Sequence, residues 1–361
     1  MKKMLIGMFI VSVLVIISAC RPPEVEGTVL NIKQELYDEA FKSSQLAIEK
    51  YPGNAEAWFY WGWLNGEKKQ NYAEMNKAFD KALELNAAQK VVYQGANVSV
   101  KEAVENYRNG EFAENYNSAV KIIGEAQKLE DEAQKKEQLD KARQKLESAI
   151  DFYPSRIEPY RPLSMVYLNL GDTTKAETVI SGAVEMFPRN EEILVSAGDI
   201  YALMNKEEKS EEILKRVLEV NPQNSAAYQK LGIIESNRDN WTAANDYYQK
   251  AMALDPNNAD LAYNIGVSFY NQQKFDDAIP YFVKSLETEP ENELGYTILA
   301  GCYVRSETKM DEGIAFLENA VQKFPQDADM WQFLAILYGK QGMKDKADEA
   351  FKKYQELKGE E

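Results

Sequence analysis

The chain has 361 residues, of which 45% are hydrophobic and 28% charged, and it contains two cysteines and no histidine. Such a chain can bury a sizeable core and does not belong to the disordered class. The lack of histidine excludes Ser-His-Asp and Cys-His catalysis and histidine-ligated zinc. Two cysteines exclude a disulfide scaffold and a four-thiolate cluster. The net charge of −16 argues against nucleic-acid binding, which needs a basic surface.

The first residues predict a targeting segment. Lys2 and Lys3 precede an apolar run from Met4 to Ala19. This run of 16 residues is shorter than the roughly 20 that cross a bilayer as a helix. We therefore predict a secretory signal peptide over residues 1–19 rather than a transmembrane anchor.

The end of that segment, Ile17-Ser18-Ala19-Cys20, resembles the bacterial lipobox. The resemblance implies that Cys20 is joined to diacylglycerol through its thiol and becomes the acylated N-terminus. The alternative is a plain signal peptide that happens to contain a cysteine. Arg21, where some lipoproteins carry Asp, implies outer-membrane sorting in a Gram-negative cell. Residues 20–32 are then expected to be the lipidated Cys and a spacer, stiffened by Pro22 and Pro23.

Prolines reveal an internal repeat in the rest of the chain. They recur every 34 residues, each closely followed by Asn, Asp or Ser, which indicates a helix end and a new N-cap. The members of this series are Pro154, Pro188, Pro222, Pro256 and Pro290, with Pro325 one residue later than the period predicts.

Between the prolines, small and large apolar residues stand at fixed helical positions. One period contains Tyr228, Leu231, Gly232, Ala244 and Tyr248, and the others repeat this order. The pattern resembles the tetratricopeptide repeat, W-x2-L-G-x2-Y followed by A-x3-F-x2-A and P. The resemblance implies an all-α, right-handed superhelical solenoid of helix-turn-helix repeats over residues 33–361. The expected helix pairs are 54–67/71–86, 157–170/173–187, 191–204/207–221, 225–238/241–255, 259–272/275–289, 293–305/310–324 and 328–341/344–358, after a helix at 33–51.

Residues 87–153 depart from the pattern and are expected to form atypical or extended repeats. We predict one helix over 89–108, stopped by Asn109-Gly110, and another over 138–153. The segment 111–136 between them is either divided at Gly124 into two helices or crosses over as one.

The sequence contains no motif for catalysis, and we expect neither enzyme activity nor a cofactor nor a metal. Phosphate-binding, dinucleotide-binding, nucleophile-elbow and calcium-loop patterns are absent. Cys302 stands in a first helix, where a buried small side chain is expected.

The tetratricopeptide resemblance also implies where partners bind, because the first helix of each repeat lines the concave face in that family. The clamp of chaperone-binding members is missing, since Phe59, Val98, Arg161 and Val195 occupy its positions. The alternative for the aromatic residues is packing: shielding by helix 33–51 for the first cluster, and contact with neighbouring first helices for the tyrosines. The predicted groove residues are Phe59, Tyr60, Trp63, Arg161, Met165, Gln229, Lys230, Tyr263, Asn264, Tyr270 and Asn271, with Asp199 and Phe333 at equivalent positions.

Together these features predict an envelope lipoprotein whose solenoid is a scaffold or adaptor for other proteins or peptides. It is attached to the membrane only through its lipid, on the periplasmic side of the outer membrane in a Gram-negative cell. The alternative is a cell-wall or glycan-associated factor that stacks sugars on an aromatic groove.

Overall fold

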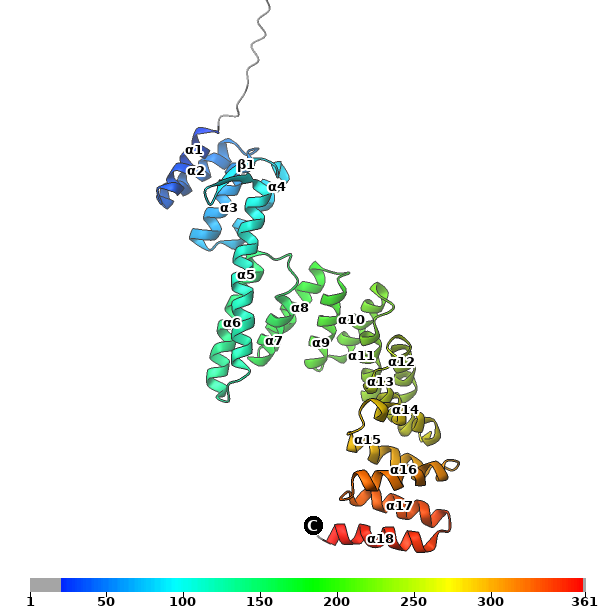
Figure 1. The fold of residues 1–361 in the computed structure, drawn as a ribbon. Helices are drawn as coiled ribbons and strands as arrows, with labels where there is room; N and C mark the ends of the chain where they lie inside the picture. Colours follow the sequence, from blue (N-terminus) through cyan, green and yellow to red (C-terminus); the bar gives the residue numbers. More distant parts are fainter. Residues whose placement is uncertain (1–20, 360–361) are drawn as a thin grey trace, which may run out of the picture. The chain divides into compact units, whose positions relative to one another are not determined.

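The computed structural model describes residues 21–359, so the predicted signal peptide and Cys20 lie outside the described residues. The described chain forms 18 α-helices and one two-stranded hairpin (Figure 1). None of these helices is both long and apolar enough to cross a membrane. The chain divides into two compact units, the first ending at Asp172 and the second beginning at Thr173. The architecture is the predicted all-α helical-repeat solenoid.

The first unit contains seven helices and the hairpin. Helices α2, α3 and α4 follow the predicted repeat boundaries closely, and α3 begins after Asn54, whose side chain accepts a hydrogen bond from the backbone N–H of Ala57. The elements are α1 (Pro23–Lys33), α2 (Tyr37–Lys50), α3 (Ala55–Lys69), α4 (Tyr72–Asn86), β1 (Lys90–Tyr93), β2 (Ala96–Ser99), α5 (Val100–Ala126), α6 (Glu132–Phe152) and α7 (Tyr160–Asn169).

The expected spacer after Cys20 is wrong for residues 23–33, which form helix α1. Pro23 is the first residue of this helix, where its missing N–H costs no hydrogen bond. Val25 and Val29 are buried against α2 and α3, so this segment belongs to the core of the first unit. The prolines start a helix here instead of stiffening a linker.

The predicted helix over 89–108 is wrong in its first half, because residues 90–99 form the hairpin. Tyr93 pairs with Ala96 across a two-residue turn. Gln94 and Gly95 have φ angles of 50° and 79°, the left-handed pair that a tight hairpin turn requires. Ser99 and Glu102 then form a capping box that starts α5.

Helix α5 runs through Asn109-Gly110 and Gly124, which we had expected to stop or divide it. Tyr107, Phe112 and Ala119 are buried, and α5 packs along α6. This burial outweighs the roughly 1 kcal/mol that an exposed glycine costs in a helix. The region therefore contains one long helical pair, and the fourth-helix alternative is wrong.

The second unit begins with the single helix α8 and continues with five helix pairs at the predicted positions. Their first helices begin at Asn or Asp caps, among them Asn190, Asn224, Asn258 and Asp327. The helices are α8 (Thr173–Met186), α9 (Glu191–Leu203), α10 (Glu207–Val220), α11 (Ser225–Asn237), α12 (Trp241–Leu254), α13 (Ala259–Asn271), α14 (Phe275–Thr288), α15 (Glu293–Arg305), α16 (Met310–Lys323), α17 (Ala328–Lys340) and α18 (Lys344–Gly359).

In three helix pairs of the second unit, a glycine of the first helix faces a large side chain of the second helix. A Cβ placed on Gly232 would lie 2.5 Å from the Tyr248 ring, and one on Gly266 would lie 2.9 Å from the Phe282 ring. Only glycine lets the two helices of these pairs approach so closely. The repeat positions therefore have the packing role that the sequence pattern predicts.

Candidate partner-binding surfaces

The first predicted cluster, Phe59, Tyr60 and Trp63, lies on α3 beneath the hairpin. Phe59 is 1% exposed and stacks on Phe79 at a centroid distance of 5.8 Å. The hydroxyl of Tyr60 donates to the carbonyl of Val92 and accepts from its N–H, both at 3.0 Å. These two residues are therefore core and hairpin-anchoring residues, and the shielding comes from α1 and the hairpin.

A cavity of about 530 Å³ opens beside this cluster, within the range of small-ligand sites. We call it the hairpin cavity. Its walls come from α1, α3, the hairpin and α5, all in the first unit. It is lined by Val29, Ile32, Lys33, Phe59, Tyr60, Trp63, Glu67, Val92, Tyr93, Gln94, Gly95, Tyr107 and Glu111.

Two carboxylates give the hairpin cavity an acidic side. Glu67 accepts a hydrogen bond from the Tyr107 hydroxyl at 3.3 Å and lies 3.5 Å from the ammonium of Lys68. The half-buried Glu111 carboxylate has no hydrogen bond or ion pair within residues 21–359. Burial, with the nearby charge of Glu67, raises the pKa of Glu111. The same two carboxylates add to burial in raising the pKa of Tyr93.

The other predicted residues of the first unit lie on α7. Arg161 is exposed and Met165 is half-buried. Neither belongs to the hairpin cavity. The first unit therefore places its predicted residues on two separate surfaces.

In the second unit, predicted positions on successive first helices contact each other. Lys230 of α11 forms an ion pair with Asp199 of α9 at 2.6 Å. The Arg305 guanidinium of α15 lies 5.7 Å from the ring centre of Tyr270 on α13. Gln229 is half-buried beside Lys230. Side-chain contacts therefore connect α9 with α11 and α13 with α15.

The predicted tyrosines of that surface are also partly core. Tyr263 makes an edge contact with Phe282 at 5.7 Å, and Tyr270 makes one with Phe275 at 5.5 Å. Both rings are half-buried. Asn264 is half-buried and Asn271 is exposed, its amide donating only to the Val267 carbonyl of its own helix. Asn271 is the most accessible member of this group.

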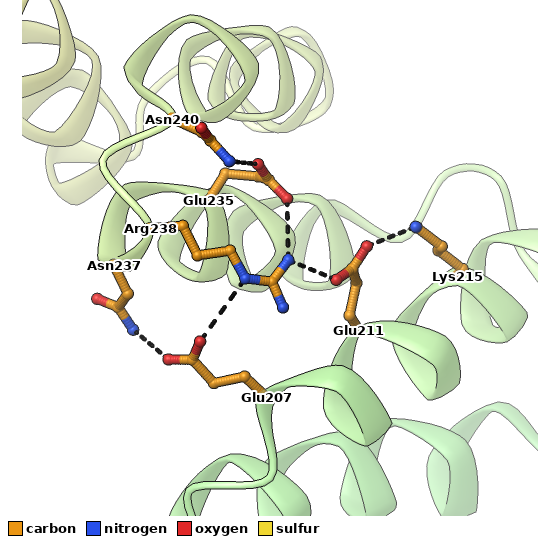
Figure 2. A network of polar contacts seen from close by, with 7 residues as sticks. All are labelled: Glu207, Glu211, Lys215, Glu235, Asn237, Arg238 and Asn240. Atoms are coloured by element: carbon orange, nitrogen blue, oxygen red, sulfur yellow. Dashed lines mark hydrogen bonds and ion pairs between the residues drawn. The ribbon is translucent and has the colours of Figure 1, made fainter.

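Sequence reasoning missed an ion-pair network that joins two repeats of the second unit (Figure 2). Arg238 lies 2.6 Å from Glu211, 3.4 Å from Glu235 and 3.8 Å from Glu207. Glu211 also pairs with Lys215 at 2.5 Å. The bonds to Lys215 and Arg238 lower the pKa of Glu211. Asn237 and Asn240 complete the network through Glu207 and Glu235.

Metal-binding and nucleophilic groups are sparse in the structure. Within the described residues, no three side chains of the metal-ligating types come together. Cys302 is buried in α15, and burial raises the pKa of its thiol to about 12. A thiol in this state is not a nucleophile at neutral pH.

Three family models match the chain. Residues 108–294, just over half of its length, match the model described as tetratricopeptide repeat protein 21 C-terminal ARM domain. Residues 328–361 match the tetratricopeptide repeat model, and residues 37–66 match the protein prenyltransferase alpha subunit repeat. None of the curated proteins matches the chain.

Solved structures with similar folds are distant in sequence. The C-terminal part of a TPR repeat-containing protein from Cytophaga hutchinsonii is 17% identical, with a TM-score of 0.52 over 67% of this chain and 95% of that one. PilF of Pseudomonas aeruginosa is 15% identical, with a TM-score of 0.48 over 63% and 98%. A tetratricopeptide repeat protein from Parabacteroides merdae is 17% identical, with a TM-score of 0.45 over 69% and 93%. Through the match of residues 108–294 to the model for the C-terminal ARM domain of tetratricopeptide repeat protein 21, the chain belongs to the tetratricopeptide repeat family.

Proposed function

We propose that this protein is a non-catalytic scaffold of the bacterial envelope, anchored by lipid on Cys20, whose repeats hold other proteins or peptides. Tetratricopeptide repeats are protein-interaction modules, and fold alone does not identify the partner. In a Gram-negative cell, we place it on the periplasmic side of the outer membrane. The acyl chains hold it there, since a single acyl chain gives only marginal membrane binding and several give a stable one.

The observation that carries the scaffold proposal is that side chains of neighbouring first helices contact each other at two places in the second unit. The Asp199–Lys230 pair and the Tyr270–Arg305 contact join neighbouring repeats. Half-buried aromatic rings with amides beside them suit a polypeptide, whose backbone needs hydrogen bonds and whose side chains need apolar contacts. The net charge of −16 favours basic or neutral partners.

A double substitution, Asn264→Arg with Asn271→Arg, tests the groove. It adds bulk and charge at the exposed Asn271 and the half-buried Asn264 without removing the half-buried tyrosine rings. The variant is expected to keep its melting temperature and to lose the partners that wild type captures from envelope extract. Asn257→Arg, the same change in the turn after Pro256, is the matched control and should keep them. An unchanged partner set in the groove variant would contradict the proposal.

The anchor is tested separately by Cys20→Ser. Metabolic labelling with a fatty-acid analogue should label wild type and leave the variant as an unlabelled precursor. Label that persists on the variant, or that is absent from wild type, would remove the lipoprotein part of the proposal and leave the scaffold part.

The glycan alternative has one observation in its favour, the half-buried Trp63 and Tyr93 rings that line the hairpin cavity. Co-sedimentation with purified cell wall, run beside the protein capture, distinguishes the two functions. Sedimentation that Trp63→Ala abolishes would support the glycan function.

A further inference from the structure

The hairpin cavity combines features that the repeat pattern does not require. Aromatic rings from three elements surround it: Trp63 from α3, Tyr93 from the hairpin and Tyr107 from α5. Phe59 contacts Tyr93 edge-on at a centroid distance of 6.0 Å. Ring faces attract cations, and the attraction grows where water is excluded. The walls therefore suit a ligand that is apolar along its length and positively charged at one end.

The carboxylates of the cavity differ in how far they are already neutralised. Glu67 has Lys68 at 3.5 Å and the Tyr107 hydroxyl at 3.3 Å. Glu111 has neither an ion pair nor a hydrogen bond among the described side chains, although it is half-buried. A carboxylate in that position loses hydration, and Lys145, whose charge lowers the pKa of Glu111, forms no ion pair with it. A ligand cation would restore the lost interaction.

We propose that the hairpin cavity is a binding site for the side chain of a lysine presented by a partner polypeptide, with its alkyl stem along Trp63 and Tyr93 and its ammonium at Glu111. This inference rests on the proposed scaffold function and adds a second contact, in the first unit, to the groove of the second. A lysine stem packs on apolar surface while its head reaches a polar group. Lys33 also lines the cavity, and its side chain is exposed. Because its positive charge repels a second cation, we expect the site to bind one ammonium group.

The alternatives fit the lining less well. An anionic ligand would meet two carboxylates and a single lysine. A neutral apolar ligand would leave Glu111 buried without a partner, at a cost in free energy. A neutral sugar would use the ring faces but would leave the charge of Glu111 unbalanced.

Peptide binding to the full chain tests the site directly. The probes are acetyl-Ala-Lys-Ala-amide and acetyl-Ala-norleucine-Ala-amide, which differ by the ammonium alone. Binding is followed by the indole N–H signal of Trp63 in two-dimensional NMR, assigned by its loss in Trp63→Phe. The lysine peptide should shift this signal and bind about tenfold more tightly than the norleucine peptide, the ratio that about 1.4 kcal/mol represents.

Two variants test whether the Glu111 carboxylate causes the preference for the lysine peptide. Glu111→Gln should reduce lysine-peptide affinity about tenfold and should not weaken norleucine-peptide binding, which the buried charge of Glu111 disfavours. Glu105→Gln, the same change on an exposed residue of α5 outside the cavity, should change neither.

Equal affinity for both peptides, no shift of the Trp63 signal, or equal effects of both variants would overturn the proposal. A Trp63 shift with a neutral disaccharide and not with the lysine peptide would overturn it in favour of the glycan function. If the lysine peptide does not bind while the Asn264→Arg, Asn271→Arg variant still loses its partners, the scaffold proposal holds and the lysine site is contradicted.

Discussion

Arg21 and Glu56 form an ion pair with an Nη2–Oε1 distance of 2.8 Å, which ties the first described residue to helix α3. The Glu56 side chain is 6% exposed, so the pair is largely withdrawn from water. Arg21 also pairs with Glu26 of α1 at 2.8 Å. Because α1 begins three residues after position 20, lipid on Cys20 would hold the first residue of α1 within about 11 Å of the anchored cysteine, at 3.3–3.6 Å per residue.

Arg21→Ala is expected to destabilise the first unit by about 1–3 kcal/mol, since it leaves a buried carboxylate without its partner. Burial raises the pKa of Glu56, and Arg21 opposes that rise. A carboxyl with a raised pKa in the folded state makes stability fall as pH rises from about 4.3 through the raised value. The deficit of the variant should therefore be largest at neutral pH and should shrink toward pH 4 in thermal melts. Adding Glu56→Gln should recover part of it, and a deficit independent of pH would contradict the account.

Gly266→Leu should destabilise the second unit by about 1–3 kcal/mol or more, because the new side chain meets the Phe282 ring. Gly339→Leu is the matched control, since a Cβ on exposed Gly339 has nothing within 4 Å and leucine is a better helix former than glycine. Hydrogen exchange should show lost protection near α13 and α14 for the first variant only. Uniform loss through residues 54–358 would indicate one cooperative unit instead of a quasi-one-dimensional array.

Arg238→Gln should lower the stability of the second unit by up to about 1 kcal/mol, the range of exposed ion pairs, and the difference should shrink in high salt. The lowered pKa of Glu211 means that its contribution is present above about 4.3 and is lost as pH falls through the lowered value. Denaturant titrations of wild type and variant should therefore converge at acidic pH. A difference that persists in strong acid would contradict an electrostatic origin.

The repeat helices could be predicted because their signals are local. Asn224 and Asn258 cap helices directly after the periodic prolines, and Gly232 marks a close helix contact. The hairpin was not predicted, because the helical pattern of the repeats was extended through residues 90–99. Its signal was present in the β-branched and aromatic run Val91-Val92-Tyr93 followed by Gln94-Gly95, which is typical of a strand and a two-residue turn.

The site could be predicted only in part, for a related reason. Trp63 was identified from its repeat position, but the opposite wall of its cavity comes from Tyr93 and Glu111. Those residues reach it through the hairpin and the long helix α5, which depart from the repeat. Tertiary packing of this kind is not encoded in a 34-residue period.

Glu111→Gln is expected to raise the stability of the first unit at neutral pH while it weakens lysine-peptide binding. The groups that set the pKa of Glu111 are Glu67 and Glu114, which raise it with burial, and Lys145, which lowers it. Because the pKa is raised, wild-type stability falls as pH rises from about 4.3 through the raised value, and the variant removes that loss. Thermal melts from pH 4 to 8 should show the two proteins diverging as pH rises. A variant that is less stable than wild type at pH 7 would make Glu111 a structural residue.

Site-specific photocrosslinking in living cells tests the scaffold account most directly. A benzophenone amino acid replaces Asn271 on the surface of first helices, and in a second strain it replaces Asn257, which is exposed in the turn between α12 and α13. The account predicts that illumination joins one partner, or a few, of defined mass to the chain at position 271 and not at position 257. The same adducts at both positions, or none at 271, would contradict a partner-binding groove.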